Sequence, residues 1–519
     1  RGDDRHFYCT GQFDGRLDIN ATHHAVTSDI GINDGFNTET FIFFGQFDHI
    51  VSGEFAPAVR GDLAVFCIQP DDDLTRKDAA GILQKPRILD GCRSDDDVRQ
   101  TVVKITFNGV EIANATTQLH GDFVQIVIFR KILHYLKNVF DGRLIDRLAC
   151  ESAVLLKNDG VLPLDTAKKI AFVGPYTNNH EIKSSWSFTG DSKDCVTIQE
   201  AAEKVFDASR TTYAEGCPVI GNDVELIGFT ETTPKKYSEE ELAAMEQSAL
   251  QAAKEADLVV MPMGEHYLQS GEATSRAMID VPEIQMELFH KVLAVNPNVV
   301  VVLFNGRPLD LREISVKAKA ILEVWFPGTE GGSAVVDVLT GKKNPSGHLP
   351  MSFPYCVGQA PVSYNEYSTG RPNLPGMKER FRSKYLDIPN APLYPFGYGL
   401  SYTTFDISAV TLDQNEMDKN GRIAAHVTVK NTGDTAGCDV VQLYIRDDYS
   451  DVVRPVRELK GFRRVELAPG KEQEVTFYIT EEDLRYYRLD GTFGSEPGTF
   501  TVFVGDSSTT ENSAVFTLK

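Results

Sequence analysis

The sequence contains no apolar run close to the roughly 20 residues that a membrane-spanning helix needs. It has neither a phosphate-binding loop nor a dinucleotide fingerprint, so it implies no cofactor. The 8 cysteines are scattered, none form a Cys-x-x-Cys pair, and no histidine stands near them at metal-ligand spacing. We therefore expect no metal site, and we expect free or buried thiols rather than a structural disulfide.

Positive charge is also scarce. The 52 Lys and Arg residues face 74 Asp and Glu residues, which gives a formal charge of −22. A chain this acidic is a poor partner for nucleic acid or for an anionic membrane, whereas neutral sugars are compatible with it. Residues 1–30 show no signal-peptide pattern, and the chain begins with Arg rather than Met, so the sequence leaves the cellular location open.

Residues 150–402 alternate short apolar runs with amphipathic segments. The apolar runs predict strands, and the segments rich in Glu, Ala, Leu and Gln predict helices. We expect strands at 169–173, 258–263, 299–304 and 320–325, and helices at 239–255, 284–295 and 331–339. This order indicates an α/β domain with a mainly parallel sheet and helices on both faces, followed by an ordered connector over 356–402.

From residue 403 the pattern changes to alternating residues separated by turn signals. We expect strands at 422–430, 439–446, 460–467, 472–479 and 499–504. Short strands at this spacing predict an antiparallel β-sandwich over residues 403–519.

Residues 1–149 show no regular strand–helix repeat. The segment is rich in Asp, Phe, Gln, Arg and Gly, and it contains the acidic clusters 71–73 and 95–97. We leave its fold unassigned. It is too short for a complete (β/α)8 barrel, which needs about 250 residues.

The most suggestive chemistry lies directly after the predicted strand 258–263. Glu272 stands between Gly271 and Ala273, and Arg276 follows four residues later. Loops at the carboxyl ends of such strands are where open α/β sheets bind ligands. A carboxylic acid on a mobile loop near a fixed cation suits a general acid that protonates a leaving oxygen. A solvated loop with a surface ion pair is the alternative reading of the same residues.

Several motifs resemble glycoside hydrolase family 3, the β-glucosidase and β-xylosidase family, over its C-terminal half. They follow the family's order from residue 151 onward: ESAVLLKNDGVLPL (151–164), IAFVGP (170–175), SWS (185–187), SGEATSR (270–276), FNGRP (304–308), WFPGTEGG (325–332), NPSGHLPMSFP (344–354) and YPFGYGLSYTTF (394–405). The resemblance implies an (α/β)6 sandwich followed by a fibronectin-III-like domain. It is strongest to the bacterial periplasmic β-glucosidases, which implies a periplasmic or secreted protein.

The resemblance also implies site residues for a retaining mechanism. Glu272 matches the family's acid/base Glu, Arg276 matches the Arg that anchors its loop, and Trp186 matches an aromatic that lines the leaving-group side of the pocket. Glu265 matches a recurring Glu for which we expect a structural role, and we expect Trp325 to be a core residue. The turn at 305–308 receives no catalytic role.

The family's nucleophile is an Asp at the end of a barrel strand. The only near match is Asp29, and Ile30 departs from the family pattern there. We therefore expect an exo-acting retaining β-glycosidase, of β-glucosidase type, whose hydrolysis is impaired because most of the nucleophile-bearing barrel is not recognisable. The alternative is a non-catalytic carbohydrate-binding or structural relic. The expected partner is a β-glucoside or a β-linked oligosaccharide. The sequence does not decide whether the protein forms a homo-oligomer.

Overall fold

The computed structural model describes residues 142–519, apart from 188–189, 227–233 and 374–375. Before residue 142 it describes only the backbone of short strands: β1 (Tyr8–Phe13), β2 (Leu17–Thr22), β3 (Gly53–Glu54), β4 (Ile105–Phe107), β5 (Val110–Ala113) and β6 (Thr116–Thr117). The candidate nucleophile Asp29 lies outside the described residues. Most of residues 1–141 lie there too, so the expectation that residues 1–149 form no complete (β/α)8 barrel stays a prediction.

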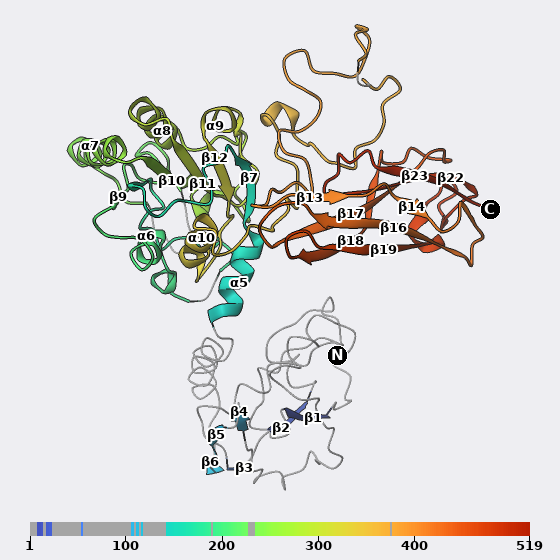
Figure 1. The fold of residues 1–519 in the computed structure, drawn as a ribbon, viewed down its shortest axis with the longest axis horizontal. Coiled ribbons are helices and arrows are strands. Elements are labelled where there is room, and N and C mark those ends of the chain that lie inside the picture. Colours follow the sequence, from blue (N-terminus) through green and yellow to red (C-terminus); the bar gives the residue numbers. More distant parts are fainter. Residues whose placement is uncertain are drawn as a thin grey trace. The chain divides into compact units, whose positions relative to one another are not determined.

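A mixed sheet of 6 strands organises the α/β domain (Figure 1). Its order is β7-β12-β11-β10-β8-β9, and only the edge strand β7 runs antiparallel to its neighbour. The strands are β7 (Val154–Asn158), β8 (Ile170–Val173), β9 (Thr211–Ala214), β10 (Leu258–Gly264), β11 (Val299–Phe304) and β12 (Ala320–Glu323). The predicted mainly parallel sheet is thus confirmed.

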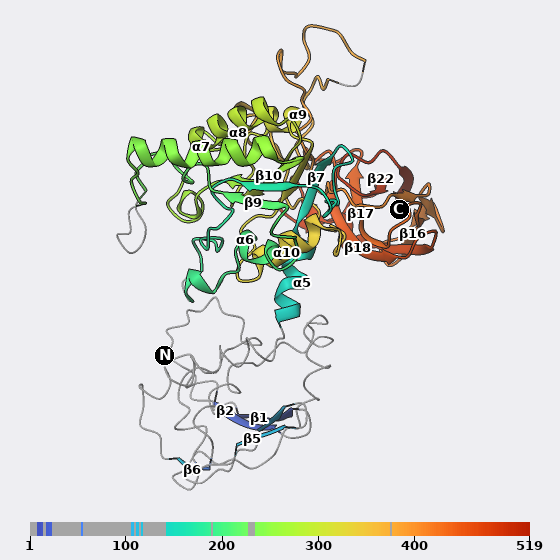
Figure 2. The same ribbon diagram turned by 60° about the vertical axis from the view of Figure 1, so that its left-hand side comes forward.

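The central strands are apolar along their whole length because helices cover both faces of the sheet. Every residue of β10 and β11 is buried. The helices are α5 (Gly142–Ser152), α6 (Ile198–Ala202), α7 (Glu239–Glu255), α8 (Glu283–Val295), α9 (Arg312–Lys317) and α10 (Gly331–Leu339). Helices α7, α8 and α9 lie on one face and α6 and α10 on the other (Figure 2). Alternate residues of each strand therefore enter two separate cores.

Helix starts are set by local chemistry. Ser238 caps α7 by accepting from the Glu241 backbone N–H, and the Glu241 side chain accepts from the Ser238 N–H in return. Helix α5 runs across residue 149, where we had placed the first domain boundary. Its buried Ala149 and Cys150 belong to the core of the α/β domain, so this domain begins before residue 150.

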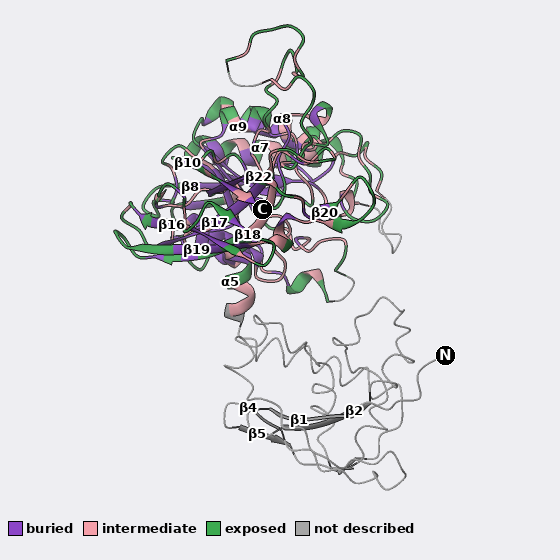
Figure 3. Cartoon of the chain, turned by 90° about the vertical axis from the view of Figure 1, so that its right-hand side faces the viewer, coloured by how far each residue is buried: buried purple, intermediate pink, exposed green. Residues whose placement is uncertain are grey.

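The C-terminal domain is a sandwich of two sheets, as predicted. One has the order β13-β16-β14 with β19 beside β16, and the other has the order β15-β23-β22-β17-β18. The strands are β13 (Phe405–Ile407), β14 (Thr411–Leu412), β15 (Glu416–Met417), β16 (Arg422–Asn431), β17 (Gly437–Asp447), β18 (Glu458–Leu467), β19 (Glu472–Thr480), β20 (Tyr486–Tyr487), β21 (Phe493–Gly494), β22 (Gly498–Gly505) and β23 (Ser513–Leu518). Inward-facing Val, Ile, Leu and Phe side chains of both sheets form one core. Figure 3 shows long buried stretches, in purple, along the strands of both sheets.

The segment between the two domains is fixed by hydrogen bonds to both. The Leu400 N–H donates to the carbonyl of Leu155 in the α/β domain at 2.8 Å, and Gln442 Nε2 of the sandwich donates to the carbonyl of Gly397 at 3.1 Å. Within the described residues, no helix has the length and apolar character needed to cross a membrane. Of the cysteines in the described part, Cys150, Cys217, Cys356 and Cys438 are free thiols, and Cys195 is buried.

Candidate active site

Loops at the carboxyl ends of the parallel strands bring the predicted site residues together. The loop after β8 carries Trp186, and the loop after β10 carries Glu272 and Arg276. Because β8 and β10 are parallel neighbours, both loops leave the sheet at the same edge. This topology is the reason that residues about 90 positions apart in the chain share one rim.

The loop around Glu272 abuts the loop around Trp186. Ser185 Oγ donates to the carbonyl of Ser270 at 2.6 Å. Gly271 has φ +111°, and a Cβ atom there would lie 2.2 Å from Ser185 Oγ and 3.2 Å from Trp186 Nε1. Only glycine allows this approach without displacement. Glu272 is exposed, and Trp186 keeps 55% of its surface exposed, so both side chains can reach a ligand.

Arg276 and the fully buried Glu265 form an ion pair beneath this loop. Arg276 Nη1 lies 3.0 Å from Glu265 Oε1, and Arg276 Nη2 donates to the carbonyl of Asp280 at 2.8 Å. The other carboxylate oxygen of Glu265 accepts from the Gly306 N–H at 3.1 Å. The structure thus places Arg276 as an anchor of the loop and Glu265 as its buried partner.

Arg307 is a second anchor, which the sequence did not reveal. Its Nε lies 3.0 Å from Glu265 Oε1. Its Nη2 donates to the carbonyl of Thr274 at 2.8 Å and also to the carbonyl of Gln269. Arg307 therefore holds both ends of the segment that carries Glu272. We had read residues 305–308 as a turn without a catalytic role, and the structure shows that this turn supports the site.

The carboxylate of Glu265 is fully occupied by its ion pairs with Arg276 and Arg307. Burial raises the pKa of its carboxyl above the ordinary value, while the Gly306 N–H and the two arginines act in the opposite direction. With two guanidinium groups at 3.0 Å, the carboxylate is the ionised partner of both. A buried and paired carboxylate cannot reach a substrate, whereas the Glu272 side chain of the same loop is exposed.

The neighbouring His266 is neutral. Burial lowers the pKa of its imidazole to about 4. Its Nδ1 accepts from the Leu268 N–H at 3.2 Å, and its ring stacks on Tyr267 with the centroids 4.7 Å apart. His266 thus shapes the start of the loop and carries no charge near neutral pH.

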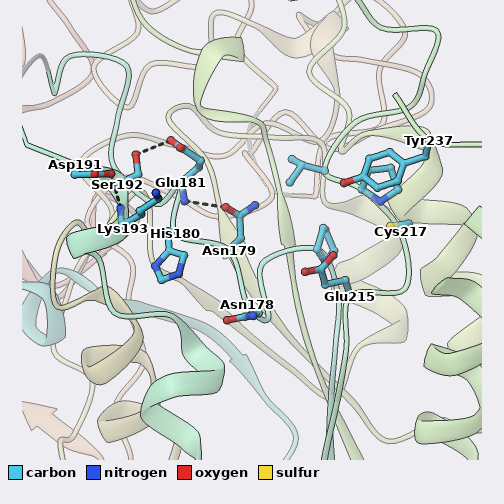
Figure 4. Close-up of a pocket in the computed structure, with 13 residues that line it drawn as sticks. Asn178, Asn179, His180, Glu181, Asp191, Ser192, Lys193, Glu215, Cys217 and Tyr237 are labelled. Atoms are coloured by element: carbon cyan, nitrogen blue, oxygen red, sulfur yellow. Dashed lines mark hydrogen bonds between the residues drawn. The ribbon is translucent and has the colours of Figure 1, made fainter. Parts of the chain in front are cut away.

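A cavity of about 400 Å³ opens between the loops that follow β8 and β9 (Figure 4). One side is lined by Asn178, Asn179, His180, Glu181, Asp191, Ser192 and Lys193, and the other by Glu215, Cys217 and Tyr237. None of Glu272, Arg276 and Trp186 is among its lining residues. Within the described part of the chain, no three His, Cys, Asp or Glu side chains are placed to hold a metal ion.

The fold is an α/β sandwich with an exposed Glu and an exposed Trp at its carboxyl edge, followed by a β-sandwich. Residues 153–402 match the family described as "Glycosyl hydrolase family 3 C-terminal domain", and residues 439–508 match "Fibronectin type III-like domain". Residues 153–402 therefore belong to the C-terminal domain of glycoside hydrolase family 3.

Relatives of known name agree with this family. The chain is 43% identical over 366 residues to "Periplasmic beta-glucosidase" of Salmonella typhimurium, an alignment that covers 70% of this chain and 48% of the relative. It is 38% identical over 372 residues to "Beta-xylosidase" of Formosa agariphila, with 70% and 48% covered. The chain thus spans about half the length of these curated relatives.

A solved structure of the same family has the same fold over the matched region. The β-glucosidase from Listeria innocua in complex with glucose aligns with a TM-score of 0.66 and 38% identity. The alignment covers 77% of this chain and 52% of that one. The predicted fold class and the predicted family are confirmed.

Proposed function

We propose that the α/β domain supplies the acid/base half of a retaining β-glycosidase active site of β-glucosidase type. The observation that carries this proposal is the exposed Glu272, on a loop anchored by Arg276 and Arg307 and in contact with the Trp186 loop. The family supports the same reading, since its named relatives are β-glucosidases and β-xylosidases.

In this mechanism Glu272 protonates the leaving glycosidic oxygen, and its carboxylate then removes a proton from the attacking water. Trp186 stacks on the C–H face of the sugar on the leaving-group side. Arg276 and Arg307 hold the loop so that the carboxyl meets the glycosidic oxygen. No cofactor takes part.

A retaining mechanism also needs a nucleophilic carboxylate about 5–5.5 Å from the acid/base group. In our proposal this group comes from outside the described residues, with Asp29 as the only motif-based candidate. Because Asp29 matches the family pattern poorly, we expect weak hydrolysis from the chain of 519 residues.

The proposed substrate is a terminal β-linked glucose unit in a glucoside or an oligosaccharide. One family structure carries glucose, and another, of a mutant, carries laminaribiose. The relative from Salmonella is named as periplasmic, so we propose an exported protein.

Hydrolysis of an aryl β-glucoside tests the proposal. We expect slow turnover that falls about 10²–10⁴-fold in Glu272→Ala, because general acid–base catalysis contributes that much. Azide, which needs no general base, restores part of this loss. Glu287→Ala, which removes an exposed carboxylate of helix α8, serves as the control and leaves turnover unchanged.

A sugar-binding measurement distinguishes the proposed glycosidase from the alternative, a non-catalytic carbohydrate-binding module. Under that alternative the chain shows no turnover, yet laminaribiose quenches tryptophan fluorescence in wild type and not in Trp186→Ala. Tyr478→Ala is the control, since Tyr478 in the sandwich is exposed to 56%. If the chain shows no turnover and no binding that depends on Trp186, both functions are refuted.

A further inference from the structure

Glu323 is a fully buried carboxyl group at the end of β12, directly behind the site loops. Its Oε1 accepts from the Trp325 N–H at 2.8 Å. Its Oε2 has no hydrogen-bond partner among the described residues. Burying an unpaired carboxylate oxygen is costly, so the state of this group needs an explanation.

Asn305, the first residue after β11, lies beside Glu323, and its side chain also has an oxygen without a hydrogen-bond partner among the described residues. It is fully buried, and its side chain lies within hydrogen-bonding reach of the Glu323 carboxyl. Its Nδ2 donates to the carbonyl of Arg307 at 2.7 Å, which identifies the other end of the amide as the oxygen. That oxygen, Oδ1, also has no partner within the described part of the chain.

The charges around Glu323 make an ionised carboxylate unfavourable. Both nearby arginines, Arg276 and Arg307, pair with Glu265. The negative charge of Glu265 itself acts on Glu323. A second buried carboxylate at this place would have an anion beside it and no cation paired to it in the described residues.

We propose that Glu323 is a neutral carboxylic acid whose Oε2–H donates to Asn305 Oδ1. One proton then satisfies both unpaired oxygens, because a protonated carboxyl is a donor and the amide oxygen is an acceptor. Burial supports this state, since it raises the pKa of Glu323 well above its ordinary value, although the Trp325 N–H and the Asn305 side chain act in the opposite direction; the charge of Glu265 adds to the rise.

This bond makes Glu323 a positioning residue for the site. It fixes Asn305, whose Nδ2 holds the carbonyl of Arg307, and Arg307 in turn holds both ends of the Glu272 loop. The Gly306 N–H in the same turn donates to Glu265. That the positioned loop is catalytic rests on the proposed function, whereas the protonation of Glu323 does not.

Urea unfolding of the full chain tests the protonation without any activity. The only 2 tryptophans, Trp186 and Trp325, both lie in the α/β domain, so their fluorescence reports its unfolding. Glu323→Gln keeps an acceptor for Trp325 and a donor for Asn305. We expect this variant to match wild type at acidic pH, just below the ordinary pKa of Glu.

The pH dependence then follows from the raised pKa. Above the ordinary pKa the unfolded state loses the Glu323 proton while the folded state keeps it, so wild type loses stability as pH rises and the Gln variant does not. The ratio of their unfolding equilibrium constants should change about tenfold per pH unit until the folded pKa is reached. If Glu323→Gln is less stable than wild type at every pH, with a constant ratio of their unfolding equilibrium constants, the proposal is overturned.

Glu265→Gln is the matched control, because it changes the other fully buried Glu of the site. It removes an ionised partner from two arginines, so we expect it to be less stable than wild type at neutral pH, opposite to Glu323→Gln. Equal losses in both variants would contradict a difference in charge state.

Cleavage after Glu272 by a Glu-specific protease tests the positioning role. We expect Glu323→Gln to be cut at the wild-type rate, and Asn305→Ala to be cut faster at this bond but not after the exposed Glu379. If Asn305→Ala leaves cleavage after Glu272 unchanged, the positioning role is wrong. This outcome is independent of glycosidase activity.

Discussion

Two fully buried polar sites, one in each domain, differ in how their side chains are paired. In the sandwich, Asn431 at the end of β16 is fully buried, and its amide is fully paired. Its Oδ1 accepts from Thr403 Oγ1 at 2.6 Å and from the Gly433 N–H at 3.1 Å. Its Nδ2 donates to the carbonyls of Thr435 and Leu467 at 2.8 and 2.9 Å. Asn431 therefore closes a turn and has no capacity left.

In the α/β domain, Glu323 and Asn305 are equally buried, yet each keeps an oxygen without a partner among the described residues. Unsatisfied buried groups are rare in folded proteins, and each one calls for a specific cause. In our proposal the cause is a single proton that these two oxygens share. The comparison contrasts a buried amide that closes a turn of the sandwich with a buried pair next to the turn that anchors the Glu272 loop.

Arg307→Ala should cause the largest loss of unfolding free energy, because it removes one of the two arginines that pair with the buried Glu265. Glu265 loses one of its two cations, and the carbonyls of Gln269 and Thr274 lose a donor. We expect a loss of about 3 kcal/mol in the unfolding free energy of the α/β domain, measured by tryptophan fluorescence in urea.

A surface ion pair supplies the control for this prediction. Arg312 pairs with Asp310 at 2.6 Å, but its side chain is 50% exposed. Arg312→Ala should therefore cost less than about 1 kcal/mol. Equal losses in the two variants would show that Arg307 is an ordinary surface arginine.

Asn431→Ala should give the next largest change, confined to the sandwich. Truncation leaves the buried carbonyl of Leu467 and the more exposed carbonyl of Thr435 without this donor, and we expect a loss of about 2 kcal/mol. Scanning calorimetry should show a lower transition for the sandwich and an unchanged one for the α/β domain. The exposed Asn420, mutated to Ala, should leave both transitions in place. A shift of the α/β transition in Asn431→Ala would refute the separation of roles.

Most of this fold could be predicted from the sequence because its strongest signals are local. Strand β11 is six apolar residues in a row, and helix α7 is an amphipathic segment rich in Glu, Ala, Leu and Gln, so both were predicted with their observed bounds. Short elements such as β9 (Thr211–Ala214) and α9 (Arg312–Lys317) escaped prediction, since a few residues carry too little periodicity.

The site was only half predictable for a physical reason. Glu272 and Trp186 were found because their motifs are contiguous in the sequence. Arg307 contacts Glu265 and Gln269, which lie about 40 positions earlier, and only the parallel pairing of β10 with β11 brings them together. The burial of Glu323 likewise depends on tertiary packing. Trp325, expected in the core, is partly buried with φ +55° and packs near Phe353.

Gly271→Ala should lower the unfolding free energy of the α/β domain moderately, because it disturbs the contact between the Glu272 and Trp186 loops. The added Cβ would meet Ser185 and Trp186 at a backbone angle that only glycine adopts easily. We expect a loss of about 1–2 kcal/mol and a shift of the Trp186 fluorescence. Gly160→Ala is the control, since Gly160 has φ +81° but open space around it. A shift of Trp186 emission in the control as well would show that the loop contact is not the cause.

His348 should give the smallest effect, and one that depends on pH. It joins the two domains: Nδ1 lies 2.6 Å from the carbonyl of Gly397, and Nε2 lies 3.4 Å from Asp439 Oδ1. Both partners are acceptors, so both ring nitrogens carry protons. Burial alone would lower the pKa of His348, but the bond to Asp439 and its charge, helped by the Gly397 carbonyl and Asp506, raise it.

The sign of the pH effect follows from the raised pKa of His348. The stabilisation is fully present below the unfolded pKa of about 6.5 and is lost as pH rises through the folded pKa. His348→Gln should therefore lose about 1 kcal/mol relative to wild type near pH 5.5, and less at pH 9. His426, half-exposed beside Glu474 within the sandwich, is the control, and His426→Gln should change little at either pH. A His348→Gln difference that grows toward alkaline pH would show that the folded state holds the imidazole neutral.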